Sequence, residues 1–207
     1  MSSQLSDQDR EQIDKGIREK YHKVASTPEG HFKYSTGKDG LKGLGYDNRL
    51  ISDLPDTVSS SFCGVGNLFS LGKVRTGAYV LDIGCGSGVD GLLAAKLVGD
   101  SGKVLGIDMT PEMVQKANTN KKLMAVDNIT FKVAKIQDLT DKDRYFDLII
   151  SNGVFNLILD KDEALQTAYR LLKPGGKMFI ADQVLSGPMS KDLKPVSYTH
   201  LRAHETT

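Results

Sequence analysis

Five short apolar segments alternate with helical segments after residue 77, and this alternation limits the fold more than any other feature. The segments are rich in β-branched and aromatic residues and lie at 79–83, 103–107, 129–133, 146–150 and 177–181. Helical stretches at 89–98, 111–125 and 161–172 separate them. This alternation predicts βαβ units and a parallel sheet. Because the strands are apolar on nearly every residue, helices are expected on both faces, as in a Rossmann-like doubly wound α/β fold.

Two regions precede this core. Residues 5–25 show apolar residues at helical spacing after Ser6, a plausible N-cap, and Thr27-Pro28 ends the predicted helix. The following stretch is rich in Gly, Ser and Asp, and we expect an irregular arm with one or two short helices over a site on the core. The predicted divisions are an N-terminal helix (1–29), an arm (30–76), a core (77–195) and a tail (196–207).

Local signals also predict how the core helices begin and end. Thr110 is expected to cap the helix that opens with Pro111, and Asp160 with Glu163 resembles a capping box. Residues 173–176 read Lys-Pro-Gly-Gly, which predicts a helix stop before the last strand.

Composition excludes several classes of protein. Lys and Arg number 27 against 26 Asp and Glu, so the chain lacks the basic excess expected of a nucleic-acid binder. Two cysteines, Cys63 and Cys85, are too few for a disulfide framework or a zinc site, and no metal is predicted. No apolar run approaches the roughly 18 residues of a membrane span, and the N-terminus lacks a signal-peptide core. We therefore expect a cytoplasmic enzyme with a small-molecule substrate; the sequence does not predict its oligomeric state.

The strongest motif is Asp82-Ile83-Gly84-Cys85-Gly86-Ser87-Gly88, at the end of the first predicted strand. Alternate glycines allow a tight turn and let a ligand approach the backbone. Val89 stands where the nicotinamide-dinucleotide motif places its third glycine, which makes a dehydrogenase a distant alternative. An acid two residues before GxGxG is typical of S-adenosylmethionine enzymes, so the motif predicts binding of that cofactor.

Residues after the other strands extend this predicted site. Asp108 follows the second strand and can accept hydrogen bonds from both ribose hydroxyls, or it can belong to the cap of the next helix. Met109 offers an apolar face for adenine, and Ile136 offers a wall beside it. After the fourth strand, Asn152 is expected to contact the methionine part of the cofactor. Asn156 is expected either to contact the substrate or to serve as a turn residue.

These motifs together resemble the class I S-adenosylmethionine-dependent methyltransferases, and in particular the arsenite methyltransferase-like group. The resemblance implies a methyltransferase that uses S-adenosylmethionine. The segments that carry the resemblance are 34–46, 61–67, 80–88, 106–113, 151–157 and 170–176.

The sequence departs from this group at the substrate side. The resemblance implies that arsenite methyltransferases bind trivalent arsenic through cysteine thiolates, but the positions matching two of these thiols carry Val65 and Gly153. Cys63 is either a displaced thiol or a small buried hydrophobic residue. Cys85 resembles a common residue of the glycine loop. The substrate-side candidates are therefore Cys63, Asn67 and Asn156, with Tyr46 beside them on the arm.

Two more departures concern the adenine site and the end of the chain. Family members carry an acid near Lys135, and a lysine cannot accept the adenine amine. The family sheet has seven strands, whereas five are predicted here, which would leave the fifth as a bare edge and a chain ending there marginally stable. Residues 196–207 resemble a translated sequencing-adapter product, and we assign this non-native tail no function.

The sequence thus predicts an S-adenosylmethionine-dependent methyltransferase acting on arsenite or another small acceptor. One alternative is a methyltransferase for a small organic molecule that keeps the arsenite-like frame without its thiols. The other is a non-catalytic fragment that only binds the cofactor.

Overall fold

The computed structural model describes residues 6–140 and 142–184, and its centre is one parallel sheet. The strand order is β3-β2-β1-β4-β5. Neighbouring strands are in parallel register, with Ile83 opposite Ile107 on one side of β1 and opposite Ser151 on the other. The predicted doubly wound α/β fold is confirmed. The strands are β1 (Tyr79–Ile83), β2 (Lys103–Asp108), β3 (Ile129–Val133), β4 (Phe146–Asn152) and β5 (Leu172–Ala181).

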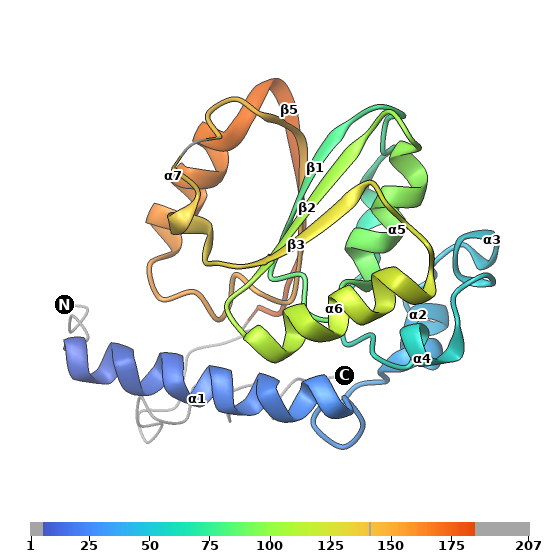
Figure 1. The fold of residues 1–207 in the computed structure, drawn as a ribbon. Helices are drawn as coiled ribbons and strands as arrows, with labels where there is room; N and C mark the ends of the chain where they lie inside the picture. Colours follow the sequence, from blue (N-terminus) through green and yellow to red (C-terminus); the bar gives the residue numbers. More distant parts are fainter. Residues whose placement is uncertain (1–5, 141, 185–207) are drawn as a thin grey trace.

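Helices cover both faces of this sheet, as the apolar strands predict. Val80 and Ile150 belong to one buried cluster, shared with α5 (Val89–Val98) and α6 (Pro111–Leu123). Leu81 and Ile149 belong to a second, shared with α7 (Lys161–Leu171). Figure 1 shows α5 and α6 on one side of the sheet and α7 on the other. Alternate side chains of the central strands β1 and β4 thus enter opposite cores.

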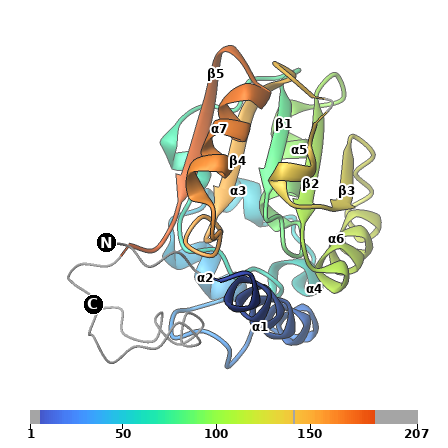
Figure 2. The same cartoon turned by 90° about the vertical axis from the view of Figure 1, so that its left-hand side faces the viewer.

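The N-terminal helix α1 (Asp7–Ser26) lies across one end of the sheet rather than on a face (Figures 1 and 2). Ser6 caps its start and Thr27 its end, as predicted, and Asp9 completes a capping box with Ser6. Ile13, Ile17 and Val24 are its buried residues.

The arm is more helical than predicted. It contains α2 (Gly37–Gly43), α3 (Asn48–Ile51), α4 (Asp56–Ser59) and the 3₁₀ helix η1 (Leu68–Leu71). Asp47 starts α3 by accepting a hydrogen bond from the Arg49 N–H, a local cap that the prediction of one or two short helices missed. Leu41 and Val58 are fully buried in the same cluster as α5, so tertiary packing completes these short helices.

Three predicted helix ends differ from the structure. Strand β5 begins at Leu172 rather than after the glycines, because Leu172 pairs with Phe146 and the Lys-Pro-Gly-Gly residues form an irregularity before Lys177 pairs with Leu148. Thr110 makes no side-chain cap. Asp160 makes none either, because its carboxylate pairs with the Arg10 guanidinium, 2.6 Å away, on α1.

The predictions about the C-terminal end of the chain concern residues outside the described range. This holds for the tail at 196–207 and for the proposed end of the sheet, of which the structure describes five strands. Among the described helices, none combines the length and apolarity needed to cross a membrane.

We predict that shortening a side chain in the core between α5 and the sheet destabilises the protein strongly. Leu92 is fully buried, so Leu92→Ala leaves a cavity and should lower the free energy of unfolding by about 2–5 kcal/mol. Urea unfolding followed by circular dichroism measures this. Leu165→Ala on α7, where the side chain is 43% exposed, is the control and should change stability by less than about 0.5 kcal/mol. Equal losses in the two variants would contradict the packing described here.

Candidate active site

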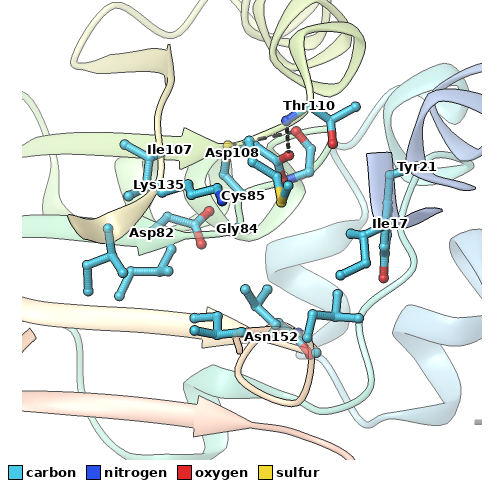
Figure 3. A pocket seen from close by; sticks show the side chains of 18 of the residues that line it. Ile17, Tyr21, Asp82, Gly84, Cys85, Ile107, Asp108, Thr110, Lys135 and Asn152 are labelled. Atoms are coloured by element: carbon cyan, nitrogen blue, oxygen red, sulfur yellow. Dashed lines mark hydrogen bonds between the residues drawn. The ribbon is translucent and has the colours of Figure 1, made fainter. Parts of the chain in front are cut away.

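A cavity of about 350 Å³ opens at the carboxyl ends of the strands, where doubly wound folds bind ligands. Loops after β1 to β4 form its floor and sides, and α1 closes it from across (Figure 3). The predicted site residues that line it are Cys63, Asp82, Gly84, Cys85, Gly86, Asp108, Met109, Ile136 and Asn152. Those that do not are Gly88, Asn67 and Asn156.

The glycine turn after β1 has the shape that the motif predicts. Gly84 has φ +67°, and a Cβ there would overlap the Val154 side chain. Gly86 has φ +52° and nothing within 4 Å of a built Cβ, so its backbone faces open space in the cavity. Gly88 lies behind the cavity at the start of α5, where a Cβ would stand 2.6 Å from the Phe131 ring. The turn therefore exposes bare backbone to a ligand.

Asp108 ties this turn to the end of β2. Its carboxylate accepts hydrogen bonds from the Gly86 and Thr110 N–H groups, both at 2.9 Å. Burial raises the pKa of Asp108, while these donors oppose the shift. The hydrogen bond from the Thr110 N–H shows that Asp108 helps to form the start of α6, which was one of its two predicted roles. The other role, binding of the ribose hydroxyls, stays a prediction.

Asp82 presents an unsatisfied acceptor. Its Oδ2 atom is buried without a hydrogen-bond partner, and the residue lines the cavity. Burial, together with the carboxylates of Asp90 and Asp108, raises the pKa of Asp82 well above its usual range. A Cβ on Gly91 would lie 2.9 Å from this oxygen, so Oδ2 faces α5, and the Gly91 backbone opposes the pKa shift.

Asp90, which the sequence analysis missed, is, like Asp82, a buried carboxylate of the cavity wall. It accepts hydrogen bonds from the Tyr46 hydroxyl at 2.6 Å and from Asn152 Nδ2 at 2.9 Å. Burial raises the pKa of Asp90 to about 6, and the two donors oppose this shift. Its place in the first turn of the helix after the glycine loop was the available signal.

The sequence analysis also missed that α1 covers the cavity. Arg10, Asp14, Ile17 and Tyr21 line the cavity at helical spacing, and Figure 3 shows Ile17 and Tyr21 across from Asp82. The periodicity of this helix was visible in the sequence, but the surface it covers was not.

Ion pairs connect α1 to the rim of the cavity. The Lys135 ammonium donates to the Asp14 carboxylate. Arg10 pairs with Asp160, and His22 Nδ1 lies 3.0 Å from Glu112 at the start of α6. Lys135 therefore holds the cover in this structure, and it offers no acceptor to a ligand.

Cys63 is the substrate-side candidate that reaches the cavity. Burial raises the pKa of its thiol to about 12, with a further contribution from Asp108 and Asp90. Cys85 also lines the cavity, and burial raises its thiol pKa well above the usual value. Both sulfurs are thus neutral near pH 7.

The other two candidates have structural partners away from the cavity. Asn67 caps η1 and donates to the Gly45 carbonyl oxygen at 2.8 Å. The Asn156 backbone N–H donates to Asp182 at 2.9 Å.

Positions 65 and 153, where the sequence departs from the arsenite-like pattern, lie against each other. A Cβ built on Gly153 would stand 3.5 Å from Val65 Cγ1. The two positions thus meet beside the cavity, and here they form an apolar contact.

Comparison with known proteins gives the context of this geometry. Residues 75–204 match a family model described as a methyltransferase domain. The chain is 32% identical to an arsenite methyltransferase of Halobacterium salinarum over 204 residues, which are 92% of this chain and 52% of that protein. It is 34% identical to a ubiquinone/menaquinone biosynthesis C-methyltransferase of Psychromonas ingrahamii over 178 residues, 78% of this chain and 68% of that protein.

A solved structure is also similar. It is an arsenic(III) S-adenosylmethionine methyltransferase from Chlamydomonas reinhardtii, with 39% identity and a TM-score of 0.60 over 65% of this chain and 48% of that one. The chain spans about half the length of the arsenite methyltransferases it resembles.

We predict that Asp90 makes stability depend on pH in the ligand-free protein. Its folded-state pKa of about 6 exceeds the unfolded value of 3.8, so its stabilising contribution is complete below pH 4 and is lost as the pH rises through 6. As the pH rises from 3.5 to 7, the free energy of unfolding of Asp90→Asn should therefore increase by about 3 kcal/mol relative to that of the natural protein. Urea unfolding at several pH values measures this.

The matched control is Asp100→Asn, in the exposed turn between α5 and β2. The pH profile of Asp90→Asn is read against that of this variant. A flat difference for Asp90→Asn would contradict the buried, ionisable role of Asp90.

Proposed function

This chain belongs to the S-adenosylmethionine-dependent methyltransferases, and we propose that its cavity transfers a methyl group from that cofactor to a small acceptor, with arsenite as the first candidate. The observation that carries the proposal is the glycine turn after β1, whose bare backbone at Gly86 faces the cavity beside the carboxyl groups of Asp82 and Asp108. Such a turn lets a ligand lie directly against the backbone, within reach of acidic side chains.

The residues present fit S-adenosylmethionine. Asp82 and the backbone at Gly86 would face its methionine part, and Asp108 would accept its ribose hydroxyls. Met109 and Ile136 supply apolar surface for the adenine ring. When bound, the cofactor supplies a methyl group on a positively charged sulfur, which an acceptor with a free electron pair can take directly.

The charges of the cavity favour a cationic ligand. Three carboxyl groups, on Asp82, Asp90 and Asp108, share this space and are desolvated. A positive ligand stabilises their ionised forms and so offsets the cost of burying them. The protein thus contributes orientation and electrostatic complementarity to methyl transfer.

Arsenite is the first candidate acceptor because the relative that matches 92% of the chain and the similar solved structure are both named for methylation of trivalent arsenic. Trivalent arsenic binds thiols, and Cys63 is a thiol of the cavity wall on the arm. Arsenic binding must displace its proton, since burial keeps the thiol neutral.

A small organic acceptor is the second candidate. The contact of Val65 with Gly153 and the apolar lining by Ile17 and Leu157 favour an apolar molecule. The similarity to a C-methyltransferase of quinone biosynthesis supports the same class.

We predict that Asp108 contributes strongly to cofactor affinity. Loss of hydrogen bonds to a charged acceptor, as in Asp108→Ala, should weaken binding of S-adenosylhomocysteine roughly tenfold to a hundredfold. Isothermal titration calorimetry measures this. The control, Asp127→Ala, removes an exposed carboxylate before β3 and should bind like the natural protein. Unchanged affinity in Asp108→Ala would remove Asp108 from the site.

The acceptor is tested by formation of S-adenosylhomocysteine. We expect product with arsenite and a thiol reductant, and its loss in Cys63→Ser without weaker binding of S-adenosylhomocysteine. Loss in Cys85→Ser alone would assign the arsenic to the other thiol. No product with arsenite despite cofactor binding would favour the organic acceptor, which a panel of hydroquinones then tests.

A further inference from the structure

Residues 61–66, here called the arm loop, form the wall of the cavity that carries Cys63. Phe62, Cys63 and Gly64 line the cavity directly. Hydrogen bonds from neighbouring elements hold three consecutive carbonyl oxygens of its first half. The pairs are Ser87 Oγ to Ser61 at 2.9 Å, Gly37 N–H to Phe62 at 2.7 Å and Tyr34 hydroxyl to Cys63 at 2.9 Å.

The Asn152 side chain holds the second half of the arm loop. Its Oδ1 accepts from the backbone N–H groups of Val65, at 2.7 Å, and Gly66, at 3.2 Å. Its Nδ2 donates to the Gly66 carbonyl oxygen at 2.9 Å. The amide thus pairs with the loop backbone as a peptide group of a neighbouring strand would.

The same amide joins the loop to the helix after the glycine turn. Asn152 Nδ2 also donates to Asp90 Oδ2 at 2.9 Å, and the Tyr46 hydroxyl donates to Asp90 Oδ1 at 2.6 Å. The Tyr46 hydroxyl lies 3.0 Å from the Gly66 carbonyl oxygen. Asn152, Asp90, Tyr46 and Gly66 therefore form one closed network, here called the amide latch.

Close packing fixes the distance between loop and latch. A Cβ on Gly64 would lie 2.7 Å from Asn152 Cγ and 2.7 Å from the Phe62 ring. A Cβ on Gly66 would lie 2.6 Å from the Ala181 Cβ at the end of β5. Only glycines at these two positions let the backbone approach this closely.

The hydrogen-bonding capacity of Asn152 is used up by these contacts. A side-chain amide has two N–H donors and an oxygen that accepts two bonds. Here the donors serve Gly66, Asp90 and, at 3.4 Å, the Tyr46 hydroxyl, and the oxygen serves Val65 and Gly66. A cofactor could contact this amide only by breaking one of those bonds. The residue lines the cavity and yet offers it no unused polar group.

We propose that Asn152 is a positioning residue, which fixes the arm loop and its Cys63 against the glycine turn through Asp90 and does not itself bind the cofactor. Its effect on methyl transfer rests on the proposed function; its effect on the loop does not. This role differs from the direct contact with the methionine part that the sequence predicts for Asn152.

Amide hydrogen exchange of the full chain tests the loop contact without any ligand. In Asn152→Ala, the protection of the Val65 and Gly66 amides should fall about tenfold or more, because their common acceptor is gone. The matched control is Asn118→Ala on α6, which removes an amide that donates to Val114 in its own helix. Unchanged protection at Val65 and Gly66 in Asn152→Ala would overturn the proposal.

Ligand affinity separates positioning from direct contact. Calorimetry should find binding of S-adenosylhomocysteine to Asn152→Ala within about threefold of the natural protein, since no hydrogen bond to the ligand is lost. The rate of methyl transfer should fall because Cys63 is displaced. Loss of affinity in parallel with the rate would mean a direct cofactor contact and overturn the proposal. A natural protein that does not bind this ligand would contradict the proposed function and leave the exchange result intact.

Asn152→Asp keeps the shape and gives a second test if the alanine variant does not fold. The new carboxylate can still accept a hydrogen bond from the Val65 N–H. It has no N–H to donate to the Asp90 carboxylate or to the Gly66 carbonyl oxygen, which Asn152 Nδ2 contacts in the natural protein. Titratable groups that face Asp90 include Tyr46 from the arm, Cys63 from the loop and Asp82 from β1.

A proton shared between the two carboxylates would replace the lost N–H. Loop protection in Asn152→Asp, corrected for intrinsic exchange, should therefore be weak at pH 8 and recover toward pH 5. Protection at pH 8 equal to that of the natural protein, or no recovery on acidification, would overturn the proposal.

Discussion

The floor of the cavity depends on two hydrogen bonds that the Asp108 carboxylate accepts. They link the N–H of Gly86, in the turn after β1, to the N–H of Thr110, at the start of α6. These groups meet because β1 and β2 are parallel neighbours in register, with Ile83 opposite Ile107, so their carboxyl ends lie side by side. The sheet thus converts a glycine motif into a turn whose backbone faces a ligand.

Burial of negative charge is the second constraint on the site. Asp82, Asp90 and Asp108 are all desolvated, and each lies close enough to affect the titration of another group in the cavity. Protein donors satisfy Asp90 and Asp108, but Asp82 Oδ2 has no partner among the described residues. The same environment keeps the Cys63 thiol protonated. A cation is therefore the ligand that this cavity stabilises best, and an acceptor that needs a thiolate must displace a proton.

The sequence predicts the fold well because strand and helix signals are local. The five apolar runs and the helices between them are confirmed, since short-range periodicity reports burial on one or two faces. Thr110 and Asp160 are the N-cap residues of α6 and α7, as predicted, but neither side chain makes the cap hydrogen bond; the Asp160 carboxylate pairs with the distant Arg10 on α1 instead. Local pattern does not show such competition.

The site was predictable only where it follows a motif. The glycine turn and Asp108 follow strand ends, and the structure brings them to one cavity. Asp90 was missed because its partners Tyr46 and Asn152 lie 44 and 62 residues away, and nothing in the helix itself indicates them. The cover by α1 was missed for the same reason: an amphipathic helix shows that it packs, but not what it covers.

Two parts of the chain divide the cavity between them. The strand ends and the glycine turn form the side predicted for the cofactor, whereas the arm loop and α1 form the opposite wall. The amide latch connects these parts through backbone atoms of Val65 and Gly66, so these hydrogen bonds do not depend on the side chain at position 65. An acceptor site built in this way can change its chemistry, as at Val65 and Gly153, while the loop stays in place.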